Sequence, residues 1–110
     1  MDEIQVKEKA EKLSQLHGCN VTPLVFKDGE DSIIGFVKEP PRIVKQRALD
    51  AVMQKGAVTA AGELMEAMLI KEESDQRLYV DRPEYDKFYL GASMACMELV
   101  KVSQEQFKKK

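Results

Sequence analysis

Two short runs rich in β-branched and aromatic residues, separated by a turn signal, constrain the fold more than any other feature of this chain. Leu24-Val25-Phe26 precedes the turn and Ile33-Ile34-Gly35-Phe36-Val37 follows it. Between them stands Asp28-Gly29-Glu30-Asp31-Ser32, where Gly29 supplies the positive φ that tight hairpin turns need. The pattern predicts a β-hairpin over residues 21–39. Because an isolated hairpin is only marginally stable in water, helices must cover it.

Prolines mark both ends of this hairpin. Pro23 lies near the start of the first strand, and proline cannot donate to a hydrogen-bond ladder, so the first strand is expected at a sheet edge. Pro40-Pro41 follows the second strand and should end it.

Helical spacing of apolar residues appears on both sides of the hairpin. Residues 2–17 are expected to form a helix that ends at Gly18, and residues 42–55 a second helix that ends at Gly56. Thr59 is expected to cap a third helix, which should be the most buried. Its apolar pattern consists of Ala61, Leu64, Met65, Met68 and Leu69.

A polar stretch, residues 71–77, is expected to form a loop that Leu78-Tyr79-Val80 anchors to the core. Asp81, with Glu84 three residues later, predicts the cap of a long last helix reaching about Phe107. This helix carries two apolar stripes, although one suffices for packing in a small domain. The first comprises Tyr85, Phe88, Ala92, Ala95, Cys96, Leu99 and Val102, and the second Leu90, Met94 and Met97.

These elements predict an α+β fold: an N-terminal helix, a β-hairpin and then a three-helix bundle, with Leu64 and Phe88 in a common core. At 110 residues the chain fits one domain, residues 1–110, with one core. The Lys-Lys-Lys end, residues 108–110, is expected to be a frayed basic tail.

Charge and hydropathy exclude several functional classes. The net charge is −2, and the 17 basic and 19 acidic residues are spread along the chain, which predicts no nucleic-acid or anionic-membrane partner. The N-terminal segment is charged where a signal peptide would be apolar, and no stretch approaches the ~20 apolar residues that span a bilayer. We therefore expect a cytoplasmic protein.

Catalytic and ligand-binding patterns are weak. The one histidine, His17, stands near Cys19 across a glycine, but no third orienting group is visible, and Cys19 and Cys96 are interpreted as free thiols. Two acidic runs, residues 28–31 and 72–75, lack metal-ligand spacing and are interpreted as turn chemistry and a solvated loop. Without a glycine-rich phosphate loop, we predict no catalytic residue, no metal and no cofactor.

Methionines give the chain its clearest indication of a binding surface. Methionine is frequent on surfaces that adapt to a partner, although it also fills gaps in cores. Both interpretations stay open for the methionines of the predicted third and fourth helices. The predicted partner-binding set is Leu90, Met94, Met97, Met65 and Met68.

From about Ile33 to the C-terminus the chain resembles the small tail-assembly chaperones of long-tailed bacteriophages and their prophage relatives. The resemblance is carried by the run Gly35-Phe36-Val37-Lys38-Glu39-Pro40-Pro41-Arg42, the helical segment 48–52, the run Leu69-Ile70-Lys71-Glu72-Glu73-Ser74-Asp75 and Tyr89-Leu90-Gly91-Ala92 in the last helix. It implies a non-enzymatic cytoplasmic adaptor that coats the aggregation-prone tape-measure protein and helps recruit tail-tube subunits. It transfers no binding role to a particular residue.

Two other functions fit the same residues. One is a small regulatory or accessory subunit of unknown pathway that self-associates, as a homo-oligomer, through the second stripe of the last helix. The other is an enzyme whose site carries no recognisable motif. Neighbouring genes for a tube protein and a very long helical protein would distinguish the phage interpretation from both.

Overall fold

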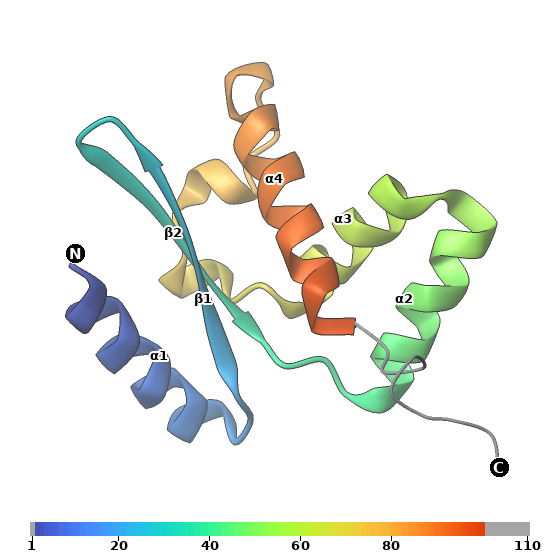
Figure 1. The fold of residues 1–110 in the computed structure, drawn as a ribbon, viewed down its shortest axis with the longest axis horizontal. Helices are drawn as coiled ribbons and strands as arrows, with labels where there is room; N and C mark the ends of the chain where they lie inside the picture. Colours follow the sequence, from blue (N-terminus) through green and yellow to red (C-terminus); the bar gives the residue numbers. More distant parts are fainter. Residues whose placement is uncertain (1, 101–110) are drawn as a thin grey trace, which may run out of the picture.

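The computed structural model describes residues 2–100, which form an α+β fold. The elements are α1 (Glu3–His17), β1 (Val21–Asp28), β2 (Asp31–Lys38), α2 (Arg42–Lys55), α3 (Ala57–Met68) and α4 (Asp86–Cys96). Figure 1 shows the hairpin standing between α1 on one side and the other helices on the other. The predicted fold class is confirmed. Residues 101–107 of the predicted last helix and the basic tail lie outside the described residues.

Local signals account for the bounds of α1. The Asp2 side chain accepts a hydrogen bond from the Gln5 N–H at 2.8 Å, and the Gln5 side chain accepts one from the Asp2 N–H at 3.0 Å. This reciprocal capping satisfies two donors that the first turn leaves unpaired. Gly18 ends the helix at φ 68°, a conformation that glycine adopts without a Cβ penalty.

The hairpin is antiparallel, and its two faces serve different hydrophobic clusters. Asp28 pairs with Asp31 across a two-residue turn in which Gly29 has φ 64°. Ile33 and Val37 belong to the larger cluster with α3 and α4, whereas Phe36 belongs to a smaller one with α1. Because successive strand residues point to opposite faces, one hairpin divides the protein into two packed layers.

The outer edge of β2 is covered by the segment that follows α3. Leu69 bridges to Val37, and the Ile70 N–H donates to the Phe36 carbonyl at 2.9 Å. The Phe36 N–H donates to Ser74 Oγ at 3.0 Å, and the Asp75 N–H donates to the Ile34 carbonyl at 2.9 Å. Residues 69–75 therefore take the place of a third strand, because they satisfy backbone groups along the outer edge of β2.

This segment differs from the predicted loop. Residues 71–77 contain the 3-10 helix Lys71–Glu73 and most of a second one, Gln76–Leu78. Leu78 is buried and anchors the segment, as predicted. Gly35 makes this packing possible, because a Cβ there would lie 2.6 Å from Leu78 Cδ1.

Two predicted helix starts are wrong. Only Gly56, at φ 97°, separates α2 from α3, so α3 begins at Ala57 and Thr59 lies inside it rather than capping it. Asp81 does not cap the last helix, since the chain turns again before α4 begins. The Arg82 N–H donates to the Val80 carbonyl, and a 3-10 helix, Pro83–Tyr85, leads into α4 at Asp86. After Cys96 a further 3-10 helix, Met97–Val100, continues the chain.

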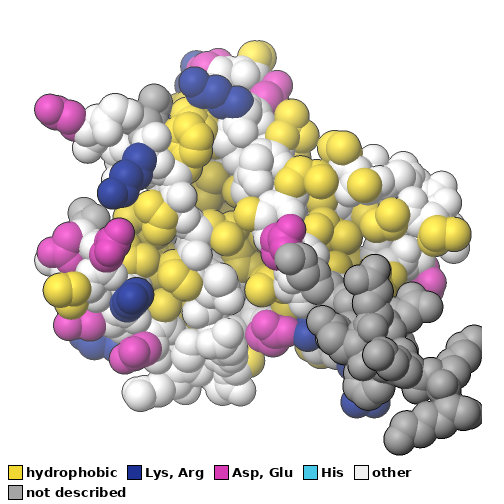
Figure 2. All heavy atoms as spheres, viewed as in Figure 1, with side chains coloured by type: hydrophobic (Ala, Val, Ile, Leu, Met, Phe, Trp, Pro, Cys, Tyr) yellow, Lys and Arg dark blue, Asp and Glu magenta, His cyan; other side chains and the backbone are white. Residues whose placement is uncertain are grey.

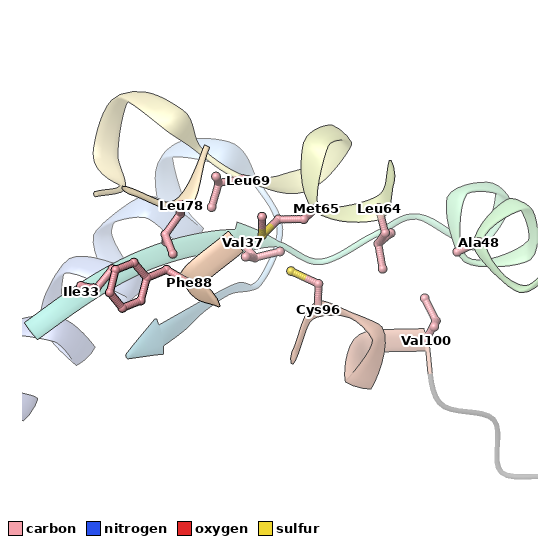
Figure 3. Close-up of a cluster of buried hydrophobic side chains, with 10 residues drawn as sticks. All are labelled: Ile33, Val37, Ala48, Leu64, Met65, Leu69, Leu78, Phe88, Cys96 and Val100. Carbon is pink, nitrogen blue, oxygen red and sulfur yellow. The ribbon is translucent and has the colours of Figure 1, made fainter. Parts of the chain in front are cut away.

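The larger core runs between β2 and the helices. Figure 3 shows it extending from Ile33 and Phe88 at one end to Ala48 and Val100 at the other. Leu64 and Phe88 share this cluster, which confirms the prediction. As expected, α3 is the most buried of the α-helices within residues 2–100, and its buried residues are Ala60, Ala61, Gly62, Leu64 and Met65.

Truncating Leu64→Ala should lower the free energy of unfolding by about 2–5 kcal/mol, because it leaves a cavity that the surrounding side chains fill only in part. Leu64 is 3% exposed within the larger core. Denaturant melts measure the loss. The control is Met53→Ala on α2, which is 87% exposed and should change stability by less than about 0.5 kcal/mol. An equally small loss for Leu64→Ala would contradict the central position of α3.

Candidate partner-binding surface

The structure separates the five predicted partner-binding residues into two groups. Leu90 and Met94 are each 44% exposed and lie one turn apart on α4. Met68 and Met97 are half-buried against the larger core. Met65 is 1% exposed and belongs to the larger core, which agrees with the core interpretation left open for it. The accessible part of the predicted set is therefore the pair Leu90 and Met94.

The first stripe of α4 faces inward, which leaves Leu90 and Met94 of the second stripe outside. Phe88 and Cys96 are buried, whereas Ala95 is exposed and Val102 lies outside the described residues. Ser93, which the apolar pattern does not include, is buried as well. Its hydroxyl donates to the Tyr89 carbonyl at 2.7 Å, and this bond within the helix satisfies the polar group.

Leu90 borders a groove of about 670 Å³ between α3 and α4. Val58 and Ala67 line it from α3, and Tyr89 lines it from α4. Gly62 forms part of its wall, where a Cβ would lie 2.5 Å from the Tyr89 hydroxyl oxygen. Gly62 thus allows the Tyr89 ring to lie against α3, although glycine in the middle of a helix costs about 0.5–1 kcal/mol relative to alanine.

A second hollow of about 440 Å³ shares Tyr89 and Leu90 with this groove and continues it toward Tyr79 and Val80. The side chains that line the two hollows include four carboxylates and no lysine or arginine. These are Glu63, Glu66, Asp81 and Asp86.

Two of these carboxylates are paired. Glu63 pairs with Lys55 at 2.9 Å and Glu66 with Lys71 at 2.7 Å. Asp81 and Asp86 have no ion-pair partner within residues 2–100. Figure 2 shows hydrophobic side chains gathered across one face, between the hairpin and α4 and onward over α3 and α2. The surface thus combines apolar area with unpaired negative charge.

The strongest charge cluster lies elsewhere, at the hairpin turn. Arg77 contacts Asp31 at 2.8 Å and Asp75 at 2.7 Å. Hydrogen bonds from Arg77 hold the pKa of both carboxyls below the usual range, and the two carboxylates raise the pKa of Arg77. This cluster ties the turn to the segment that covers β2. The sequence patterns missed it because Asp31 and Arg77 are far apart along the chain.

The residues considered as catalytic candidates, His17 and Cys19, form no recognisable catalytic arrangement in the described part of the chain. His17 is exposed at the end of α1, and Cys19 follows the glycine that ends this helix. Cys19 and Cys96 both carry free thiols, and burial raises the pKa of Cys96 to about 12, so this thiol stays protonated. Between residues 2 and 100, no three His, Cys, Asp or Glu side chains gather as metal ligands would. The predicted absence of catalysis stays a prediction.

Comparisons with protein-family models, with curated proteins and with solved structures found no match to this chain. The helices described here are too short or too polar to cross a membrane.

The Arg77 cluster predicts how stability depends on pH. The Asp31 and Asp75 carboxyls have lowered pKa values, so their contribution is full above the unfolded value of about 4 and is lost as pH falls below it. Replacing Arg77→Gln should therefore reduce the drop in melting temperature between neutral pH and about pH 3.

Thermal melts at low salt, across that pH range, measure the effect. The control is Arg47→Gln, which removes an exposed cation that has no ion pair among the described residues. Its pH dependence should match that of the unaltered protein. The same drop in melting temperature for both variants would show that other carboxylates govern the acid response.

Proposed function

We propose that this protein is a non-enzymatic adaptor that binds a helical segment of another protein along the exposed face of α4. The proposal rests on one observation: Leu90 and Met94 are large apolar side chains that stay exposed one helical turn apart, on a helix that buries Phe88, Ser93 and Cys96. An apolar pair at this spacing matches the contact points of a helix that lies in a groove. The groove between α3 and α4 supplies the adjoining concave surface.

The carboxylates around the groove indicate the chemistry of the partner. Asp81 and Asp86 lack cationic partners within the described chain, and the groove itself contributes no positive side chain. The complementary ligand is a helix with an apolar stripe bordered by lysine or arginine. Opposite charges at the rim would speed the encounter and set the orientation, and the apolar contact would supply most of the affinity.

Within this class the protein that best fits the sequence resemblance is a phage tail-assembly chaperone. Its proposed partners are the tape-measure protein, whose long helices need cover before assembly, and the tail-tube protein. The proposal places the chain in the cytoplasm, the host cytoplasm if a phage encodes it. It also predicts that adjacent genes encode a tube protein and a very long helical protein, which genome sequence can test.

Binding should depend on the apolar pair of α4. The double change Leu90→Gln and Met94→Gln keeps helix propensity and net charge while removing apolar contact area. We expect it to abolish the ability of the protein to keep a tape-measure fragment in solution, with the melting temperature nearly unchanged because both positions are exposed. Co-sedimentation of the mixed proteins measures the soluble fraction.

The chain offers a matched control on its other side. Ile4→Gln and Leu16→Gln make the same chemical change at two exposed positions of α1, beyond the hairpin. This variant should protect the fragment as the unaltered protein does. Equal protection by both double variants would exclude the α4 face, and equal loss would indicate non-specific apolar contact.

A third variant tests the groove. In Gly62→Ala the added Cβ meets the Tyr89 hydroxyl, so the ring must move within the groove, while alanine itself favours the helix. Binding should weaken although the fold is kept.

A further inference from the structure

The outer edge of β1 carries backbone groups that point away from β2. In an antiparallel pair, alternate residues direct both their N–H and C=O groups at the neighbouring strand. The Glu39 N–H donates to the Asn20 carbonyl at 2.8 Å, and this bond together with the register fixes the alternation. Thr22, Leu24 and Phe26 therefore bond to β2, and the groups of the residues between them face outward.

The first two outward-facing residues of this edge, Val21 and Pro23, offer no free N–H group. The Val21 N–H donates to Ser14 Oγ of α1 at 2.9 Å, and Pro23 has no N–H to offer. The remaining residues of this edge are Val25 and Lys27. Their N–H and C=O groups have no hydrogen-bond partner within the described part of the chain.

Apolar side chains flank this open stretch on both faces of the hairpin. Val25 and Phe26 are each 49% exposed. Phe26 packs edge-to-face on Phe88, with ring centroids 5.4 Å apart. Beside these rings lies a hollow of about 200 Å³ that Leu24 and Ala92 also line. Exposed aromatic area next to unpaired backbone groups is the composition of a strand-pairing interface.

We propose that two copies of this chain pair antiparallel through β1, with the two-fold axis at Phe26, so that the two hairpins form one continuous sheet. This register sets Val25 opposite Lys27 of the second copy, and each such pair exchanges both N–H···O bonds. All the open groups of Val25 and Lys27 are then used. A two-fold axis at Val25 would instead set Lys27 opposite Pro23 and leave an acceptor without its donor.

The side chains agree with this register. On the α4 side, Phe26 faces Phe26 of the second copy, and cross-strand aromatic pairs stabilise sheets. On the α1 side, Lys27 of the second copy lies over Val25, beside a groove that Asp2, Glu3, Lys7 and Lys27 help to line. Carboxylates and ammonium groups balance there, so the Lys27 stem contributes apolar contact with Val25 rather than a net charge attraction. The register itself favours a second copy over an unrelated strand, because each open N–H and C=O group meets its partner on an identical strand.

The substitution Val25→Pro tests the pairing directly. It removes an N–H that points away from β2, as Pro23 already does two residues earlier, so the hairpin keeps its own bonds. The dimer loses one bond per copy, and we expect its dissociation constant to rise about tenfold or more. Pro23→Val restores the donor that the register centred on Val25 lacks, so it should admit that slipped register and tighten the dimer. Sedimentation equilibrium over a range of concentrations measures both.

Amide hydrogen exchange of the unaltered protein gives a test that needs no variant. The Val25 and Lys27 amides should become protected as concentration rises, whereas the Phe26 amide, bonded to β2, should be protected throughout. A protein that stays monomeric with fast-exchanging Val25 and Lys27 amides at every concentration would overturn the proposal, as would a dimer that Val25→Pro leaves unchanged. Neither result bears on the α4 face, which Leu90→Gln and Met94→Gln test separately.

Discussion

The hydrogen bonds between β2 and residues 69–75 are the interactions on which the rest of the structure depends. A two-stranded hairpin is marginal alone, and this one is stabilised by α1 on one face, the helices on the other and a chain segment along one edge. Ser74 is central, because its hydroxyl accepts from the Phe36 N–H and donates to the Ile70 carbonyl at 2.7 Å. The same segment then brings Leu78 against Gly35 and leads to α4.

A domain of this size has limited interior, and α4 carries more apolar surface than that interior can take. Its inward side meets β2 and α3, where the larger core is already filled by Phe88 and Cys96. Leu90 and Met94 therefore stay exposed, and Leu90 borders the groove that Gly62 and Tyr89 help to line. The proposed adaptor function depends on this combination, in which exposed apolar side chains are left over from a core that is complete without them.

Sequence patterns predicted the elements that local chemistry specifies. The Gly29 turn, the helix ends at Gly18 and Gly56, and the shared core of Leu64 and Phe88 were all predicted correctly. Missed features depend on contacts between distant residues: the path of 71–78 follows from Ser74 bonding to Phe36, and Arg77 acts through Asp31. The same limit applied to the site. Periodicity identified Leu90, Met94 and Met97 as a spare stripe, but it could not show that Met97 is half-buried or that Met65 faces the core.

Because residues 69–75 cover the outer edge of β2, pairing through β1 would stop at two copies. A sheet with two open edges can add strands without limit, whereas here residues 69–75 occupy the far edge of each hairpin. Two copies joined at β1 therefore make a sheet with no open edge left for a third, which is a closed two-fold contact. Pro23 and Ser14 also restrict the register, because Pro23 has no N–H and Ser14 accepts from the Val21 N–H. A long open edge admits slipped pairings, but an edge reduced to Val25 and Lys27 satisfies its groups in the register centred on Phe26.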